Sequence, residues 1–359
     1  MWEKVKMSKL RGIFITCVIA ALSVMAGACD FRPLVEPGNT HYVRVYLDEH
    51  ILNTTEGFYN PEHVKPVYKR PEIMRVTLGD KSTGRVVAER YLRNHGDDAR
   101  GHYYDGYIIC DPGEWSLLAW NFDTEATQVS DPADQHLSKA YTNRIASHLM
   151  AGISSRLDKT KTDGTSAQEK IVYEPDHIFV AREPDVSIPY SAAIDTLRTP
   201  DGEYFTASTI VESWYIQVNV KGLEYVSSAL GLITGLAGSK TLFEAGLDSD
   251  DPVTDYFEMT ARKAPEGSYT GVIYATFNTF GKIPGIRSGL EVTFDFQTNY
   301  GKAFSATIDI SEEFLKENAV KHRWIILDKT IEIPKGESGG GGFSPGVNDW
   351  SDINTDLII

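Results

Sequence analysis

Short runs of alternating apolar and polar residues dominate the first part of the chain. Val43, Val45 and Leu47 face one way, and Tyr42, Arg44 and Tyr46 face the other. This period of two is typical of a strand with one buried face. Met74, Val76 and Leu78 repeat the pattern, and the turn at Gly79–Gly84 leads into Arg85–Leu92, so this region predicts a hairpin.

A second pair of strands flanks the turn at Asp111–Gly113. Tyr107–Cys110 enters the turn and Glu114–Asn121 leaves it. The outgoing strand is apolar on both sides, with Trp115, Leu117 and Ala119 on one and Leu118 and Trp120 on the other. Such a strand is expected inside a sandwich or under a cover.

The second half of the chain carries more strand patterns. They are an alternation through Trp214, Ile216, Val218 and Val220, three candidates at Tyr269–Phe280, Leu290–Gln297 and Ala303–Ile310, and a last strand at Ile325–Ile333. In the middle candidate, Leu290, Val292, Phe294 and Phe296 share a face. These patterns predict a second sheet.

Two segments depart from the alternation. Lys221–Gly238 is apolar, holds four glycines and has no charge after Glu224. We expect a buried helix-like or loop segment packed on the sheet, with a membrane-inserting loop as the alternative. Ser311, followed by Glu312 and Glu313, predicts an N-cap and a short helix over Glu312–Asn318.

Most of the chain is therefore short strands joined by turns, without the alternation of strands and helices that marks a parallel sheet. Lys159–Glu169 is polar and without apolar period, which indicates an exposed loop or a domain link. We predict an all-β protein of two tandem β-sandwich domains, residues 29–165 and 166–335, with a C-terminal extension at 336–359.

The N-terminus has the pattern of an export signal over residues 1–28. Four basic residues precede an uncharged apolar run that starts at Ile13, and Ala26, Gly27 and Ala28 lead directly to Cys29. The run is short for a spanning helix, which needs about 20 apolar residues. Small residues before a Cys are similar to the lipobox of bacterial lipoproteins, although Ala26 stands where Leu is usual. We expect Cys29 to be cut free as the new N-terminus and acylated, for example with palmitate; a plain cut or an uncleaved anchor is the alternative.

The net charge limits the classes of partner that the chain can bind, and the cysteine content limits its thiol chemistry. Removal of the signal, with its four basic residues and Glu3, takes the net charge from −15 to −18. So acidic a body has no electrostatic attraction for nucleic acid or anionic headgroups, and we exclude both as main partners. Cys110 is then the single free thiol, expected as a buried small hydrophobe rather than a nucleophile.

No motif specifies an enzyme, a cofactor or a metal site, although several clusters suggest chemistry. They are His95, Asp97, Asp98 and His102; Asp248, Asp250, Asp251 and Asp255; Glu174–His177; and the aromatic residues Trp115, Trp120, Trp214, Tyr215, Trp324 and Trp350. The first cluster lacks zinc spacing and the second lacks the glycine of a calcium loop, so polar loops are expected. The third has no GxSxG or HExxH partner, so a structural turn is expected. Most of the aromatic residues follow strand periods and belong in cores, although a sugar platform is the alternative.

The tail is set apart by the flexible linker Gly336–Gly342. Beyond it, Ile353, Leu357 and Ile359 alternate with polar residues, which predicts a strand that has left its domain.

Taken in order, several stretches are similar to one group of proteins. They are the Cys29 box, DPGEWSLLAWNFDTEAT at Asp111–Thr127, YEPDHIFVA at Tyr173–Ala181, KGLEYVSSALGLITGLAG at Lys221–Gly238, and the glycine-rich tail Gly339–Ile359. The chain resembles the Bacteroidales lipoproteins related to the FimB-type anchor or minor subunits of type V fimbriae. The resemblance spans nearly the whole mature chain.

The resemblance implies two transthyretin-like (Greek-key) β-sandwich domains, a lipidated N-terminus at the outer membrane or cell surface, and no enzymatic activity. It also implies assembly by strand exchange, in which a terminal strand completes the sheet of the next subunit. Trp350, Ile353, Leu357 and Ile359 would form the donor, with Leu357 and Ile359 filling the groove. In the alternative, the tail folds back on its own second domain. A surface lipoprotein that binds carbohydrate through exposed aromatic residues is the second functional hypothesis, and a hydrolase with close carboxylates is the third.

Overall fold

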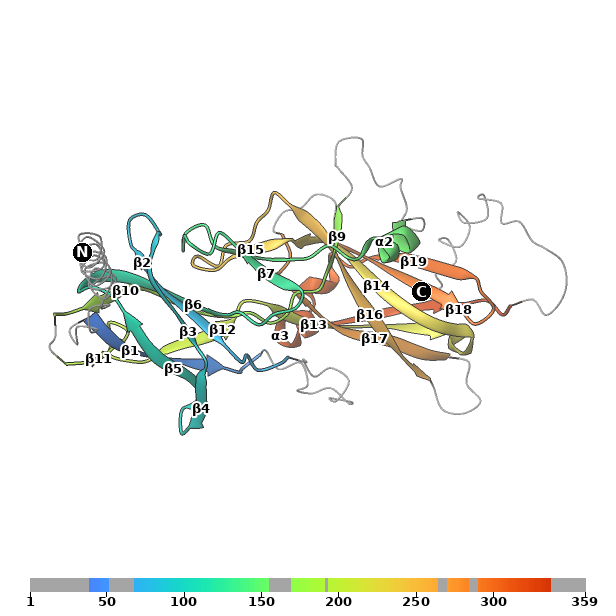
Figure 1. Ribbon diagram of the computed structural model, residues 1–359. Helices are drawn as coiled ribbons and strands as arrows, with labels where there is room; N and C mark the ends of the chain where they lie inside the picture. Colours follow the sequence, from blue (N-terminus) through green and yellow to red (C-terminus); the bar gives the residue numbers. More distant parts are fainter. Residues whose placement is uncertain are drawn as a thin grey trace, which may run out of the picture.

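The computed structural model describes residues 39–51, 68–154, 169–190, 193–263, 270–283 and 290–336. Two large sheets lie end to end (Figure 1), and the α-helices of these ranges are short, α2 (Ser147–Ser154) and α3 (Glu317–His322). The predicted all-β class and sandwich architecture are confirmed. Within the described ranges, no helix has the length and apolar character needed to cross a membrane.

The first sheet has the strand order β3-β2-β6-β10-β12-β1-β5-β4, with β11 beside the start of β1. Its strands are β1 (Thr40–Asp48), β2 (Met74–Asp80), β3 (Val86–Leu92), β4 (Asn94–Asp98), β5 (Gly101–Ile109), β6 (Gly113–Asn121), β10 (Phe179–Ile188), β11 (Asp195–Thr196) and β12 (Phe205–Thr209). The predicted β2–β3 hairpin is confirmed.

The first sheet folds over on itself at the short β10–β12 contact, which joins only Phe179 to Thr209 and Val180 to Ser208. The inward residues of its two halves then meet in one core, which includes Val43, Val45, Leu47, Met74, Val76, Leu78, Leu117, Phe179 and Phe205. Each fully buried side chain of this kind contributes about 2 kcal/mol of hydrophobic stabilisation. The face predicted for β1 is therefore buried, whereas β2 is buried on both faces, because Arg75 and Thr77 are covered as well.

The strands on the two sides of the Asp111–Gly113 turn do not pair with each other. β5 lies between β1 and β4, whereas β6 lies between β2 and β10. The prediction that β6 is covered on both faces is confirmed, because Leu117 packs in the sheet core while Leu118 and Trp120 are buried on the opposite side.

That opposite side packs against a small third sheet, β15-β8-β7, which draws its strands from both halves of the chain. They are β7 (Thr127–Ser130), β8 (Lys139–Thr142) and β15 (Ser239–Thr241). A junction core forms there from Leu118, Trp120, Ala140, Ile178, Val180, Ile210, Val211, Ala237, Leu242, Phe280 and Ile283. The two large sheets are thus joined by a packed apolar interface.

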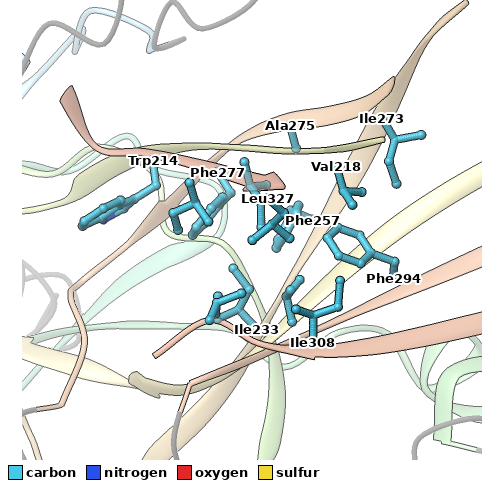
Figure 2. Close-up of a cluster of buried hydrophobic side chains, with 14 of the residues drawn as sticks. Trp214, Val218, Ile233, Phe257, Ile273, Ala275, Phe277, Phe294, Ile308 and Leu327 are labelled. Carbon is cyan, nitrogen blue, oxygen red and sulfur yellow. The ribbon is translucent and has the colours of Figure 1, made fainter. Parts of the chain in front are cut away.

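The second sheet has the order β19-β18-β14-β16-β17-β13-β20, with β9 beside β16. Its strands are β9 (Lys170–Tyr173), β13 (Glu212–Lys221), β14 (Val226–Ala237), β16 (Pro252–Lys263), β17 (Thr270–Thr279), β18 (Glu291–Thr298), β19 (Ala303–Asp309) and β20 (Trp324–Glu332). Figure 2 shows residues from these strands, among them Trp214, Phe257, Phe294 and Leu327, converging on one interior. The shared face predicted for Leu290–Phe296 is buried in it.

The expectation for Lys221–Gly238 was wrong. After the short 3₁₀ turn η4 (Leu223–Tyr225), this segment forms β14, which pairs with β16 on one side and β18 on the other. Its glycines reflect packing rather than a loop: a Cβ at Gly231 would lie 2.3 Å from the ring of Phe257. Gly235 has φ 77°, in the left-handed region, where the register with β16 shifts.

The predicted helix after Ser311 is also different in detail. The chain forms the 3₁₀ turn η5 (Glu313–Leu315) and then α3, and neither has a side-chain N-cap bond. Ser311 Oγ instead accepts a hydrogen bond from Leu290 N. Ser311 is thus used to tie the start of β18 to the end of β19.

The chain does not pass from the first sheet to the second at the predicted domain boundary after residue 165. β9 joins the second sheet, β10, β11 and β12 then return to the first, and the second sheet resumes at β13. The ranges 29–165 and 166–335 stay a prediction about independently folding units. The strand order makes residue 211, between β12 and β13, the sharper place to test it.

We expect a fragment of residues 30–165 to show no cooperative unfolding, because it lacks β10 and β12, the central strands that connect β6 to β1. A fragment of residues 30–211 keeps every strand of the first sheet and should unfold cooperatively. Urea titrations followed by circular dichroism, with residues 30–359 as the control, measure both. A cooperative transition in the shorter fragment would show that the predicted boundary holds.

Candidate functional site

Strand edges are the surfaces of this fold best suited to join another chain, because one side of an edge strand lacks a strand partner. Among the described strands, the two large sheets end at β3 and β4 and at β19 and β20. Three of these edges carry charges: Glu89 and Arg90 in β3, Asp97 and Asp98 in β4, and Asp328, Lys329 and Glu332 in β20. Charges at an edge oppose strand addition.

The fourth edge, β19, has no charged residue from Ala303 to Ile308. It runs antiparallel to β18, with Phe304 opposite Phe296 and Ala306 opposite Phe294. Phe296 and Phe294 are completely buried, whereas Phe304 and Ala306 pack against the same core and are only partly buried. A strand added to β19 would cover them, so β19 is the candidate site for β-strand addition.

The second feature is the crossover Glu174–Ile178, the segment that carries the chain from β9 in the second sheet to β10 in the first. Asp176 Oδ2 accepts three backbone hydrogen bonds, from the N–H groups of Glu125, Ala126 and Thr127, at 2.8, 2.6 and 3.0 Å. Asn278, in β17, donates from its backbone N to Glu174 Oε2 at 2.8 Å and from Nδ2 to the carbonyl of Pro175 at 3.1 Å. The crossover is thus tied to the second sheet and to the segment that leads from β6 into β7.

His177 lies at the centre of the crossover and is 5 % exposed. Its Nδ1 is 2.8 Å from Thr209 Oγ1 in β12, and its Nε2 is 2.9 Å from Ser213 Oγ in β13. The imidazole therefore bridges the last strand of the first sheet and the next strand of the second. Burial lowers the pKa of His177 to about 4, from an ordinary value of 6.5.

Carboxyl groups lie close to this crossover on the side of the second sheet. Burial raises the pKa of Glu174 from its ordinary 4.5 to about 7, against the opposing effect of the Asn278 N–H. Burial likewise raises the pKa of Asp255 well above 3.8, with Glu174 and Glu169 adding repulsion. The groups beside these acids make structural contacts: His177 lies within hydrogen-bond distance of the hydroxyls of Thr209 and Ser213, and Ser213 Oγ donates to Asn278 Oδ1. The expectation of a structural turn at Glu174–His177 agrees with these contacts.

The expectation of polar loops at the other two clusters was wrong in part. His95, Asp97 and Asp98 lie in β4 and His102 lies in β5, which pair as a hairpin, and Asp255 lies in β16. His102 Nδ1 lies 3.2 Å from Asp97 Oδ1, while Asp98 accepts from Tyr46 at 2.7 Å and Arg44 at 3.2 Å. Asp248 and Asp251 form ion pairs with Lys139 and Lys170, whereas Asp255 is buried in β16. In the described ranges, no three His, Cys, Asp or Glu side chains are arranged to hold a metal ion. Cys110 is buried, which raises its pKa to about 11.

The tryptophans singled out in the sequence do not form a sugar platform in the described part of the chain. Trp120, Trp214 and Trp324 are buried, and the partly buried Trp115 packs against the first core. Tyrosines 42, 46, 103 and 204 gather on the outer face of the first sheet, but guanidinium groups already cover ring faces there. Arg44 lies 3.9 Å from the centre of Tyr103, and Arg198 lies 3.5 Å from that of Tyr204. Stacking of a sugar needs those faces free.

The site residues predicted from the sequence, Cys29, Trp350, Ile353, Leu357 and Ile359, lie outside the described residues. Sequence reasoning singled out Glu174–His177 as a structural turn but missed that this segment crosses between the two sheets, and it missed the edge at β19. The uncharged run in β19 was visible, but nothing in the sequence marked that strand as an edge. Asn121, Thr209, Ser213 and Asn278, which hold the crossover, carry no local signal at all.

Comparison with known proteins finds fimbrial and adhesin proteins that are similar to this chain. Residues 66–258 match the family "Domain of unknown function (DUF5119)". The chain is 25 % identical over 323 residues to the "Putative fimbrium anchoring subunit Fim4B" of Bacteroides ovatus, which covers 80 % of this chain and 85 % of that protein. The predicted resemblance to fimbrial anchor and minor-subunit proteins is confirmed.

Solved structures also match. A "putative adhesin" from Bacteroides ovatus covers 87 % of this chain and 99 % of its own, at 20 % identity and a TM-score of 0.53, which shows a shared fold. The fimbrial anchor protein Mfa2 of Porphyromonas gingivalis matches 82 % of this chain and 90 % of its own, at 14 % identity and a TM-score of 0.43.

The crossover predicts a specific pH dependence. His177 has its pKa lowered on folding, so its contribution to stability is lost as the pH falls from about 6.5 to 4. Glu174 has its pKa raised, so its contribution is lost as the pH rises from about 4.5 to 7. The two effects oppose each other, and each corresponds to at most about 3 kcal/mol.

Relative to the wild type, Glu174→Gln should therefore become less stable as the pH falls from 7 to 4.5, and His177→Gln should become more stable over the same range. Urea unfolding at a series of pH values measures the free energy of unfolding of all three proteins. Three parallel profiles would contradict the assignment.

Proposed function

This chain belongs to the family described as Domain of unknown function (DUF5119), and from that premise we propose that it is a lipid-anchored fimbrial subunit, an anchor or minor structural component without enzymatic activity. The observation that carries the proposal is the match to a fimbrium anchoring subunit over most of both chains. The fold agrees with a passive structural role, because its buried polar groups are used to tie two sheets together.

The two ends of the chain have different roles in this proposal. Cys29, freed by signal cleavage and acylated, attaches the protein to the outer membrane at the cell surface. The tail strand with Trp350, Ile353, Leu357 and Ile359 joins the next fimbrial subunit by strand exchange. β19 supports the same mode of assembly from the accepting side, since it is an edge strand without charge from Ala303 to Ile308, over a partly covered core.

Removal of Trp350–Ile359 should leave a folded, lipidated protein that no longer joins fimbrial subunits, because the donor strand is gone. Co-purification of subunits from outer membranes measures this, with thermal unfolding as the control for folding. A sharper test compares two double variants. One carries Ile353→Asp and Leu357→Asp, and its control carries Asn354→Ser and Asp356→Ser. Only the first double variant alters the apolar side of the strand, so only it should abolish assembly. Unchanged assembly after the deletion would falsify the donor role.

Cys29→Ser should lose fatty-acid labelling and move from the outer-membrane fraction to the soluble fraction, because the thiol that carries the lipid is absent. Metabolic labelling with a palmitate analogue and cell fractionation measure both effects. Cys110→Ser is the matched control: that thiol is buried, so labelling should persist. Membrane attachment and label retained in Cys29→Ser would show that another feature anchors the protein.

A further inference from the structure

Four large apolar side chains are exposed at the end of the first sheet where β1 begins. Tyr107 is 53 % exposed, Ile109 56 %, Tyr190 84 % and Ile194 56 %. Scattered exposed apolar residues are ordinary on a protein surface, whereas a group at one place indicates contact with something else.

Strand register brings these residues together. Ile109 lies opposite Thr40, and Tyr107 lies opposite Tyr42, on one side of β1. On the other side, Asp195 pairs with His41, which places Ile194 beside the first residue of β1. Tyr190 follows the end of β10, where Ile188 pairs with Gly113 in the turn after Ile109. The labels of β1, β10 and β11 mark the same end of the molecule in Figure 1.

This end is also the end from which the chain leads back to Cys29. Only residues 30–39 separate Cys29 from β1. Ten residues span at most about 35 Å even when fully extended. If Cys29 carries the lipid, the exposed group is therefore held within that distance of the bilayer surface.

We infer that Tyr107, Ile109, Tyr190 and Ile194 form a lipid-facing pole that rests in the headgroup region of the membrane. Tyrosine suits that region because its ring is apolar and its hydroxyl polar. The inference rests on the proposed N-terminal lipid anchor. The pole orients the body, so that the second sheet and its edge β19 are directed away from the bilayer.

The charges around the pole select the kind of lipid. Asp111 and Asp195 lie at the same end of the sheet, two residues after Ile109 and one residue after Ile194 in the chain. Lys81 there is already paired with Glu114 and Asp185. Carboxylates at the rim repel anionic headgroups. The occupant is therefore a zwitterionic lipid surface.

The test uses residues 30–359, which keep every described residue, with a hexahistidine tag at the N-terminus in place of the acyl chain. The protein is captured on phosphatidylcholine vesicles that contain a nickel-chelating lipid. An environment-sensitive fluorophore is placed at Ile194→Cys or, as a matched control, at Val320→Cys, which is 68 % exposed in α3. The buried Cys110 stays unlabelled because its thiol is protonated and covered.

Nitroxide-labelled lipid should quench the fluorophore at residue 194 at least twofold more than the one at residue 320. Replacing Ile109 and Tyr190 by Ser should remove that difference, and phosphatidylglycerol in the vesicles should reduce it. Equal quenching at the two positions overturns the inference. An emission change at residue 194 that depends on protein concentration without vesicles also overturns it, because a second copy then covers the pole. Mass spectrometry of the native N-terminus tests acylation separately, so failure of the anchor and failure of the pole are distinguished.

Discussion

The structure depends on the order in which the chain visits its two sheets. After β6 and the small sheet, the chain adds β9 to the second sheet, and only then supplies β10 and β12, which complete the middle of the first. The crossover between these visits is held by Asp176, His177 and Asn121, whose side chains bond backbone or side-chain groups of both halves. The junction core around Trp120 and Phe280 packs against the same region. The two sheets therefore form one connected body.

The crossover also shows how a buried polar segment is made compatible with an apolar junction. The backbone carbonyls of Pro175, Asp176, His177 and Ile178 each accept a hydrogen bond, as burial of backbone groups requires. His177 is held neutral between two hydroxyls, and Glu174 has a raised pKa. Burial thus lowers the pKa of the base His177 and raises the pKa of the acid Glu174. Both shifts favour the uncharged form, which limits the net charge enclosed at the crossover.

This connectivity bears on a role as a fimbrial anchor. A subunit that links a membrane to a filament, as proposed here, would carry tension from one end to the other, and the packed junction and bonded crossover connect the two sheets along that path. In the assembly proposed above, the accepting edge is β19, which carries no charge from Ala303 to Ile308, whereas the other three sheet ends carry charges. The tyrosines on the outer face of the first sheet are engaged with Arg44 and Arg198, so that face contributes stability rather than a free recognition surface.

The sequence by itself identified many of the strands and several of their buried faces. Alternation identified Val43–Leu47 and Leu290–Phe296 as inward-facing, and the doubly apolar Leu117–Trp120 as covered, because a period of two depends only on local burial. It misjudged Lys221–Gly238, since glycines that admit the ring of Phe257 look the same in sequence as glycines of a loop. The tertiary structure alone decided that Phe179–Thr209 returns to the first sheet, that β19 is an edge, and that His177 meets Thr209 and Ser213. These are pairings between residues far apart in the chain, and they are set by which apolar faces can be buried together, a property that no local pattern carries.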